Sequence, residues 1–432
     1  MGELDVAALL GEIAGIGRDA RRGGYSRHVF DEHEARLRAW FTGHAARLGL
    51  TVAPDGNGNL WAWWGDPGPG AVLTGSHLDS VPGGGAYDGP LGVASALAAV
   101  SRLRAARERP PRPLAVVAFA EEEGSRFGRA CLGSRLAAGQ ADPAAVREYR
   151  DAAGVTFADA ARAAGIDPAG IGPVPWAARA ACFVELHVEQ GRALADLGQP
   201  VAIATTILAH GRWALAFTGQ GNHAGTTAMA GRRDPAAAAA RTVLAARDLA
   251  LAADPAPGDN SKMRGRAVPG RAVAARATVG QAEFIPGGTN VIASRVTLSL
   301  DCRAGDDASL EALVAAIAGA AEQAATAEGC TVTMSRASLS PLVVFDAALR
   351  DTIAALLPGA PLLATGAGHD AGVLAALIPT AMLFVRNPSG VSHAPGEGAS
   401  DDDCRAGVGA LTTVLRHLLS GGRAGPRQAA PR

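Results

Sequence analysis

The 432-residue chain is long enough for two or three domains, and its 48% hydrophobic and 19% charged residues are ordinary for a globular protein. Its formal net charge of -1 gives no electrostatic argument for binding nucleic acid or an anionic membrane. The first residues lack the basic region and apolar core of a secretory signal, and no apolar stretch approaches the roughly 18 residues of a membrane span. We therefore expect a cytoplasmic protein.

The first part of the chain alternates helical and strand-like segments. Helical apolar spacing with an acidic start runs from Asp31 to Leu50. Strand-like LTGS, a helix at 90–108 and the apolar run LAVVAFA follow, and Pro90 suits the first turn of that helix. This alternation predicts βαβ units in a largely parallel sheet.

The rhythm changes from about residue 211. The expected elements are a strand at 212–219, a helix at 234–252, strands at 272–284 and 295–304, a helix at 308–329 and a strand at 330–339. This βαββαβ order is that of a ferredoxin-like sandwich. The earlier pattern resumes with a helix at 346–358, a strand at 380–387 and a closing helix near 399–421. We therefore expect an α/β protein whose mostly parallel-sheet frame (1–210 and 339–420) carries an inserted domain (211–338), with a disordered tail at 421–432.

Side chains of the metal-ligand type follow several of these strand-like runs. They are His77 and Asp79 after AVLTGS, Asp88 in GGGAYDGPLG, Glu121, Glu122 and Glu123 after PLAVVAFA, His187 in FVELHVEQG, and His393 after AMLFVRNPSGVS. In an open α/β sheet, ligands bind beyond the carboxyl ends of the strands. Imidazoles and carboxylates that converge there form a divalent-metal site. A single histidine is more often structural, but the joint pattern predicts a metallohydrolase.

The spacing of these residues suggests different tasks. His77 and Asp79 lie two apart, so on an extended segment they share one face, and the carboxylate can orient the imidazole. Asp88 lies in a glycine-rich turn before a helix, which could hold a carboxylate rigidly between two ions. Neighbouring glutamates diverge, so one residue of EEEG can bind metal while the next acts as a general base.

Seven ordered motifs carry a resemblance that covers nearly the whole chain. They are GSHLDSVPGGGAYDGPLGV, AFAEEEGSRF, ELHVEQG, GNHAGTT, NVI followed by DCR, GAGHDAG, and SHAPGE. In this order the motifs resemble the M20 metallopeptidase superfamily, and within it the amidase/hydantoinase/carbamoylase branch. That branch holds N-carbamoyl-L-amino acid hydrolases, β-ureidopropionases and allantoate amidohydrolases.

The resemblance implies two divalent ions per chain, Zn²⁺ or Mn²⁺. The implied ligands are Asp88 as the bridge, His77 and His187 on one ion, and Glu123 and His393 on the other. Glu122 matches the general base that deprotonates the attacking water, and Asp79 matches the partner of His77. No role follows for Glu121.

The resemblance also implies that the inserted domain is a lid and forms a homodimer. His223 in GNHAGTT matches a residue that reaches the reacting carbonyl, while Asn290 and Arg303 match positions that grip a substrate carboxylate. Gln190 matches a substrate contact on the frame. A long polar segment, DPAPGDNSKMRGRAVPG, is a candidate lid loop.

The favoured activity is hydrolysis of a linear ureido or carbamoyl C–N bond in a small carboxylate substrate, releasing ammonia and carbon dioxide. Allantoate is placed slightly ahead of N-carbamoyl-L-amino acids. Hydrolysis of N-formimidoyl or N-formyl amino acids is a related alternative. An aminoacylase or dipeptidase, and a catalytically silent metal-binding protein, are further alternatives. Arg386 and Asn387 lie shortly before His393 in an unusual lead-in, so they are candidates for shaping a substrate pocket.

Overall fold

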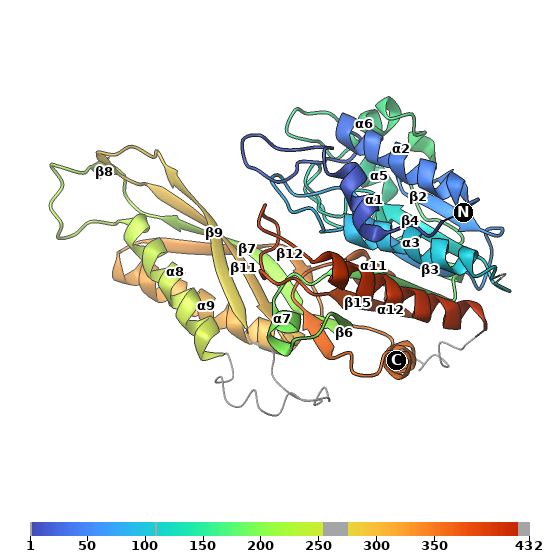
Figure 1. The fold of residues 1–432 in the computed structure, drawn as a ribbon. Coiled ribbons are helices and arrows are strands. Elements are labelled where there is room, and N and C mark those ends of the chain that lie inside the picture. The colour runs from blue at the N-terminus through green and yellow to red at the C-terminus, as the bar shows by residue number, and fades with distance from the viewer. Residues whose placement is uncertain (1, 109, 254–274, 422–432) are drawn as a thin grey trace. The chain divides into compact units, whose positions relative to one another are not determined.

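The computed structural model describes residues 2–108, 110–253 and 275–421 and has a mixed α/β fold (Figure 1). The chain divides into two compact units. The frame unit takes both ends of the chain, up to Thr205 and from Val344 onward, and the insert unit spans Thr206–Val343. The expected lid loop and the tail beyond residue 421 lie outside the described residues. None of the described helices combines the length and apolarity needed to cross a membrane.

One sheet organises the frame unit. Its strands in chain order are β1 (Thr51–Pro54), β2 (Leu60–Trp64), β3 (Val72–His77), β4 (Leu114–Phe119), β5 (Cys182–Val188), β6 (Val201–Ile207), β13 (Val343–Val344), β14 (Leu362–Thr365) and β15 (Thr380–Val385). The spatial order is β1-β2-β4-β3-β5-β15-β6-β13, with β14 paired to β6. The four central strands β4, β3, β5 and β15 are parallel. The expectation of a mainly parallel central sheet is therefore confirmed.

The helices of the frame unit are α1 (Val6–Ile13), α2 (Glu32–Arg47), α3 (Pro90–Ala105), α4 (Leu132–Ala137), α5 (Pro143–Arg147), α6 (Phe157–Ala163), α7 (Ala193–Leu197), α10 (Ala347–Leu356), α11 (Asp370–Leu374) and α12 (Asp401–Leu419). Helices α2, α3, α10, α11 and α12 contact the strands of this sheet. Helices α3 and α12 pack against each other (Figure 1). Every residue of β3, β4, β5 and β15 is buried, as expected for parallel strands covered on both faces.

The insert unit has its own sheet and core. Its elements are β7 (Ala209–Thr218), β8 (Asn222–His223), α8 (Pro235–Ala252), β9 (Arg276–Ile285), β10 (Val291–Ile292), β11 (Arg295–Ala304), α9 (Asp307–Ala327) and β12 (Thr331–Ser340). The four long strands form an antiparallel sheet in the order β12-β7-β11-β9. Buried residues alternate along β7 and β11, so one face of the sheet packs with α8 and α9 into the core of this unit.

Candidate metal centre

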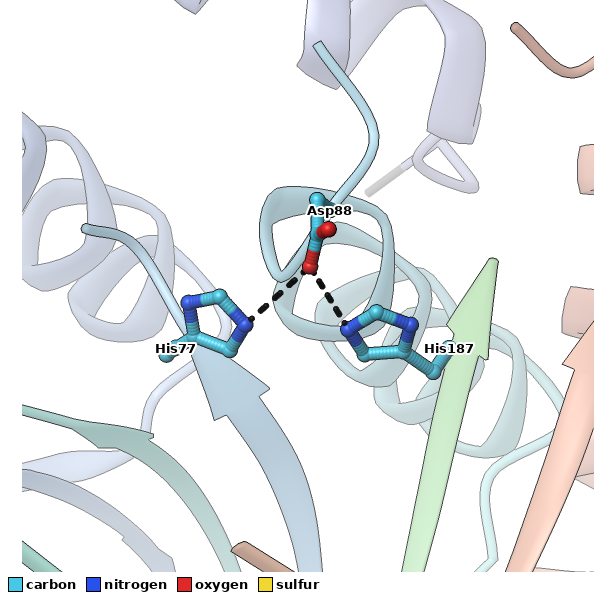
Figure 2. Close-up of side chains that lie close together, drawn as sticks. All are labelled: His77, Asp88 and His187. Atoms are coloured by element: carbon cyan, nitrogen blue, oxygen red, sulfur yellow. Dashed lines mark ion pairs between the residues drawn. The ribbon is translucent and has the colours of Figure 1, made fainter. Parts of the chain in front are cut away.

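Two histidines and one aspartate meet at the carboxyl edge of the central sheet (Figure 2). His77 is the last residue of β3, and His187 lies near the end of the parallel neighbour β5, so both imidazoles reach the same edge. Asp88 comes from the turn before α3. Its Oδ1 atom lies 3.1 Å from Nε2 of His187 and 3.6 Å from Nε2 of His77. All three side chains are buried.

A second group shares Asp88. The Nε2 atom of His393 lies 3.3 Å from Oδ2 of Asp88 and 3.5 Å from Oε2 of Glu123. Glu123 follows β4, and His393 lies in the loop after β15. One oxygen of Asp88 therefore faces His77 and His187, while the other faces His393. The five residues expected as ligands form two clusters with ligand atoms within 4.8 Å of one another.

Three ligand-type atoms of these clusters have no hydrogen-bond partner in the described part of the chain. Among the described residues, His77 Nε2, His187 Nε2 and Glu123 Oε1 are buried and have no hydrogen-bond partner. A buried polar atom left unsatisfied costs about 1–3 kcal/mol. Imidazole nitrogens and carboxylate oxygens are ligands that Zn²⁺ and Mn²⁺ accept. The donor set therefore fits divalent cations.

The pKa shifts of the buried carboxyl groups and imidazoles indicate that this centre is stabilised by positive charge. Burial raises the pKa of Glu123 to about 7 and that of Glu122 well above its usual value. Burial alone would raise the pKa of Asp88, but the imidazoles around its carboxylate hold that pKa well below its ordinary value. The hydrogen bond to Asp88 raises the pKa of His393 to about 9. Without a cation the cluster retains protons, and metal binding should displace them.

Asp79 organises the ends of β3 and β4. Its Oδ1 atom accepts the backbone N–H of Glu122 at 3.2 Å, and Oδ2 accepts that of Glu123 at 3.0 Å. The same Oδ1 lies 3.5 Å from Nδ1 of His77. Oε2 of Glu122 lies 3.7 Å from Nε2 of His77, so its carboxylate faces the first cluster. Asp79 can thus orient an imidazole and fix the main chain of the candidate base.

Glu121, which the sequence leaves without a role, turns away from this centre. Its backbone has a left-handed φ of 54°, and Oε1 accepts the N–H groups of Arg126 and Phe127 at 3.0 and 2.6 Å. It lines a small cavity of about 10 Å³ with Asp79 and Glu34. Burial, and then the Asp79 carboxylate, raise the pKa of Glu121 to about 8.

Two polar side chains hold Asp88 from outside the ligand set. Nε2 of Gln190 donates to Oδ2 of Asp88 at 2.7 Å, so the expected substrate contact is here a contact to a candidate ligand. Oε1 of Glu397 accepts the backbone N–H groups of Tyr87 and Asp88 at 3.1 and 2.9 Å. The role of Glu397 was missed, although SHAPGE signalled it as a motif residue.

Arg386 and Asn387 both make contacts within the frame unit. Arg386 pairs with Asp403 in the first turn of α12 at 2.8 Å. Asn387 is buried, and its Oδ1 accepts the N–H groups of Ser389 and Gly390, both at 3.2 Å. Nδ2 of Asn387 donates to the carbonyl of Val391 at 2.8 Å. These contacts shape the turn that leads to His393, and a role of either residue in a substrate pocket stays a prediction.

In the insert unit, His223 and Asn290 line one open cavity. The cavity has a volume of about 490 Å³. Nδ1 of His223 lies 3.0 Å from the N–H of Gly225 and 3.2 Å from that of Thr226. Because a backbone N–H can only donate, Nδ1 is an acceptor, and the neutral ring carries its proton on Nε2. His223 can therefore donate one hydrogen bond from Nε2.

Arg303 does not join His223 and Asn290. It lies near the end of β11, whereas Ser294, which lines the cavity, precedes the start of that strand. At about 3.3 Å per strand residue, roughly 30 Å separate them. Arg303 pairs instead with Asp301, Nε to Oδ1, at 2.9 Å. The expected clamp of Asn290 and Arg303 around a single carboxylate is thus not formed within one insert unit.

Known proteins resemble this chain over most of its length. An N-carbamoyl-L-amino acid amidohydrolase from Geobacillus stearothermophilus is 37% identical over 95% of this chain and 97% of its own. An allantoate amidohydrolase from Bacillus subtilis is 34% identical over 80% and 81% of the two chains. The crystal structure of a hydantoinase/carbamoylase family amidase from Burkholderia multivorans, 30% identical, superposes with a TM-score of 0.81 over 98% of this chain and 99% of that chain. The pattern of peptidase family M20/M25/M40 matches residues 73–417, so the chain belongs to that family.

Proposed function

We propose that this protein is a metal-dependent amidohydrolase that cleaves a linear ureido or carbamoyl C–N bond in a small carboxylate-bearing substrate. The observation that carries the proposal is the pair of ligand clusters that share Asp88, with the Glu122 carboxylate beside them. Relatives named for N-carbamoyl-L-amino acids and for allantoate define the two leading substrate classes. Cleavage would release ammonia and carbon dioxide.

The ligand assignment follows the two clusters. Two ions, Zn²⁺ or Mn²⁺, would be held by His77, His187 and Asp88 on one side and by Asp88, Glu123 and His393 on the other. When bound, such a pair supplies a water of lowered pKa and polarises the scissile carbonyl. Glu122 accepts the proton of the attacking water and passes it to the leaving nitrogen. Asp79 keeps His77 and the main chain of Glu122 in place for this transfer.

The insert unit supplies the contacts to the rest of the substrate. His223, with its proton on Nε2, donates to the carbonyl oxygen as negative charge develops there. Asn290 in the same cavity offers an amide to the substrate. The order of strands and helices supports a ferredoxin-like lid that closes over the frame.

The separation between Arg303 and the cavity lined by His223, Asn290 and Ser294 favours a homodimer. A small substrate cannot span roughly 30 Å of strand. We propose that Arg303 of one copy acts with His223 and Asn290 of the other at each site. The test is to co-express Arg303→Ala and His223→Ala subunits, each of which should have low activity on its own. With a shared site, random pairing leaves one intact site in half the dimers, so about a quarter of wild-type activity returns. No recovery would show that both residues act within one copy.

An assay of ammonia release tests the proposed activity. The purified protein, loaded with Mn²⁺ or Zn²⁺, should release ammonia from allantoate or an N-carbamoyl-L-amino acid and lose activity on chelation. Activity confined to N-formimidoyl-glutamate, or to N-acyl amino acids and dipeptides, would overturn the ureido assignment while retaining the metal chemistry. Glu122→Gln protein serves as the metal-loaded control that lacks the base.

A further inference from the structure

The candidate base is followed by a loop that folds back onto the same strand end. Three successive N–H groups at the start of α4 donate to successive carbonyls: Cys131 to Glu122 at 2.6 Å, Leu132 to Glu121 at 3.0 Å, and Gly133 to Ala120 at 2.9 Å. The first N–H groups of a helix have no partner within the helix, so these bonds satisfy them. The start of α4 is thereby docked against the glutamate run.

Two left-handed residues close this loop. Gly124 has φ +65°, and a Cβ there would lie 2.6 Å from the backbone nitrogen of Ala130, so the loop can return this closely only with glycine. Cys131 has φ 56°, a conformation that few residues other than glycine adopt. This conformation, together with its backbone bond to Glu122, places the thiol over the carboxylate of that residue.

The Cys131 thiol contacts the candidate base directly. Its Sγ lies 3.2 Å from Oε1 of Glu122, and both side chains are buried. No other hydrogen bond to this carboxylate occurs among residues 2–108, 110–253 and 275–421. The thiol is fully enclosed, and burial raises its pKa well above the usual value, so it remains an S–H donor. The second oxygen, Oε2, is the one that faces His77.

We propose that Cys131 is a positioning residue for Glu122. Its S–H donates to Oε1, which fixes the carboxylate rotamer and leaves Oε2 directed at the centre, where the proton is to be accepted. This role rests on the proposed function of Glu122 as general base. A thiol that only filled space would be replaced by any side chain of similar volume without a specific effect on proton transfer.

Four variants test this role: Cys131→Ala, Cys131→Ser, Glu122→Gln and the Cys131→Ala/Glu122→Gln pair. Cys131→Ala should lower kcat roughly fivefold, with KM and bound metal unchanged, because a single hydrogen bond from a weak S–H donor is lost. Cys131→Ser, which retains a donor, should recover most of that loss. In the Glu122→Gln background, Cys131→Ala should have no further effect. Cys182→Ala, which removes another buried thiol of the frame unit, is the control.

An infrared measurement on metal-free protein provides a readout independent of activity. The S–H stretching band of Cys131, isolated by subtracting the Cys131→Ala spectrum, should be shifted by its hydrogen bond and should move in Glu122→Gln protein. Wild-type kcat in Cys131→Ala, or equal losses in both backgrounds, would overturn the positioning role. Wild-type kcat in Glu122→Gln would instead refute the base assignment, and the S–H band would still report whether the hydrogen bond exists.

Discussion

Glu121 makes the stability of the metal-free protein depend on pH. Its folded pKa is raised from 4.5 to about 8, because the carboxyl is buried and faces Asp79. Stability from a raised carboxyl pKa is fully present below the unfolded value and is lost as pH rises through the folded value. The whole shift in pKa corresponds to a change of roughly 5 kcal/mol in the free energy of unfolding. In Glu121→Gln protein the amide oxygen can still accept the N–H groups of Arg126 and Phe127, but the ionisation is gone.

The assay is urea unfolding of metal-free wild-type and Glu121→Gln protein across this pH range. The two should differ little near pH 5, while at about pH 9 the variant should be more stable by roughly 2–5 kcal/mol. Glu148→Gln, an exposed position in the frame unit, is the control and should follow the wild type. Parallel curves for Glu121→Gln and wild type would show that Glu121 is already ionised at neutral pH, and the reasoning would fail.

Three further predictions address the centre and the clamp. Glu122→Gln should lower kcat by on the order of 10² or more with metal content retained, whereas Glu123→Gln should lose metal; exchanged phenotypes would mean that the two roles are reversed. A Cβ on Gly85 would fall on the Glu397 carboxylate that holds the Asp88 loop, so Gly85→Ala should weaken Mn²⁺ binding in titrations of metal-free protein, and unchanged affinity would contradict this. Arg303→Ala should cost roughly 2–4 kcal/mol in kcat/KM for carboxylate substrates. A variant that still strongly prefers the free carboxylate would place the clamp elsewhere.

The sequence is informative wherever side-chain chemistry coincides with the end of an apolar strand. His77 and His187 could be grouped in advance because parallel neighbouring strands place their carboxyl ends together. The mainly parallel sheet followed from the same alternation of elements. The hairpin of β1 and β2 and the short helices between residues 132 and 163 were not predicted, because brief segments held by caps and glycines carry little periodicity.

Contacts that depend on strand register, or that join residues far apart in the sequence, could not be predicted. Arg303 and Asn290 lie only 13 positions apart in the sequence, yet most of strand β11 separates them in space. Glu397 reaches the backbone of Asp88 across 309 positions of sequence. The contact of Cys131 with Glu122 requires a left-handed backbone at a residue other than glycine, which composition does not reveal.

One hydrogen bond joins the two segments of the frame unit that flank the insert unit. The chain leaves the frame after Thr205 and returns at Val344, and the N–H of Phe345 donates to the carbonyl of Thr205 at 3.1 Å. A short turn could therefore join β6 to β13 without disturbing any other strand of the frame. Gain or loss of the whole insert would then change the chain at one place only, and all residues of the two ligand clusters that share Asp88 lie outside the removed segment.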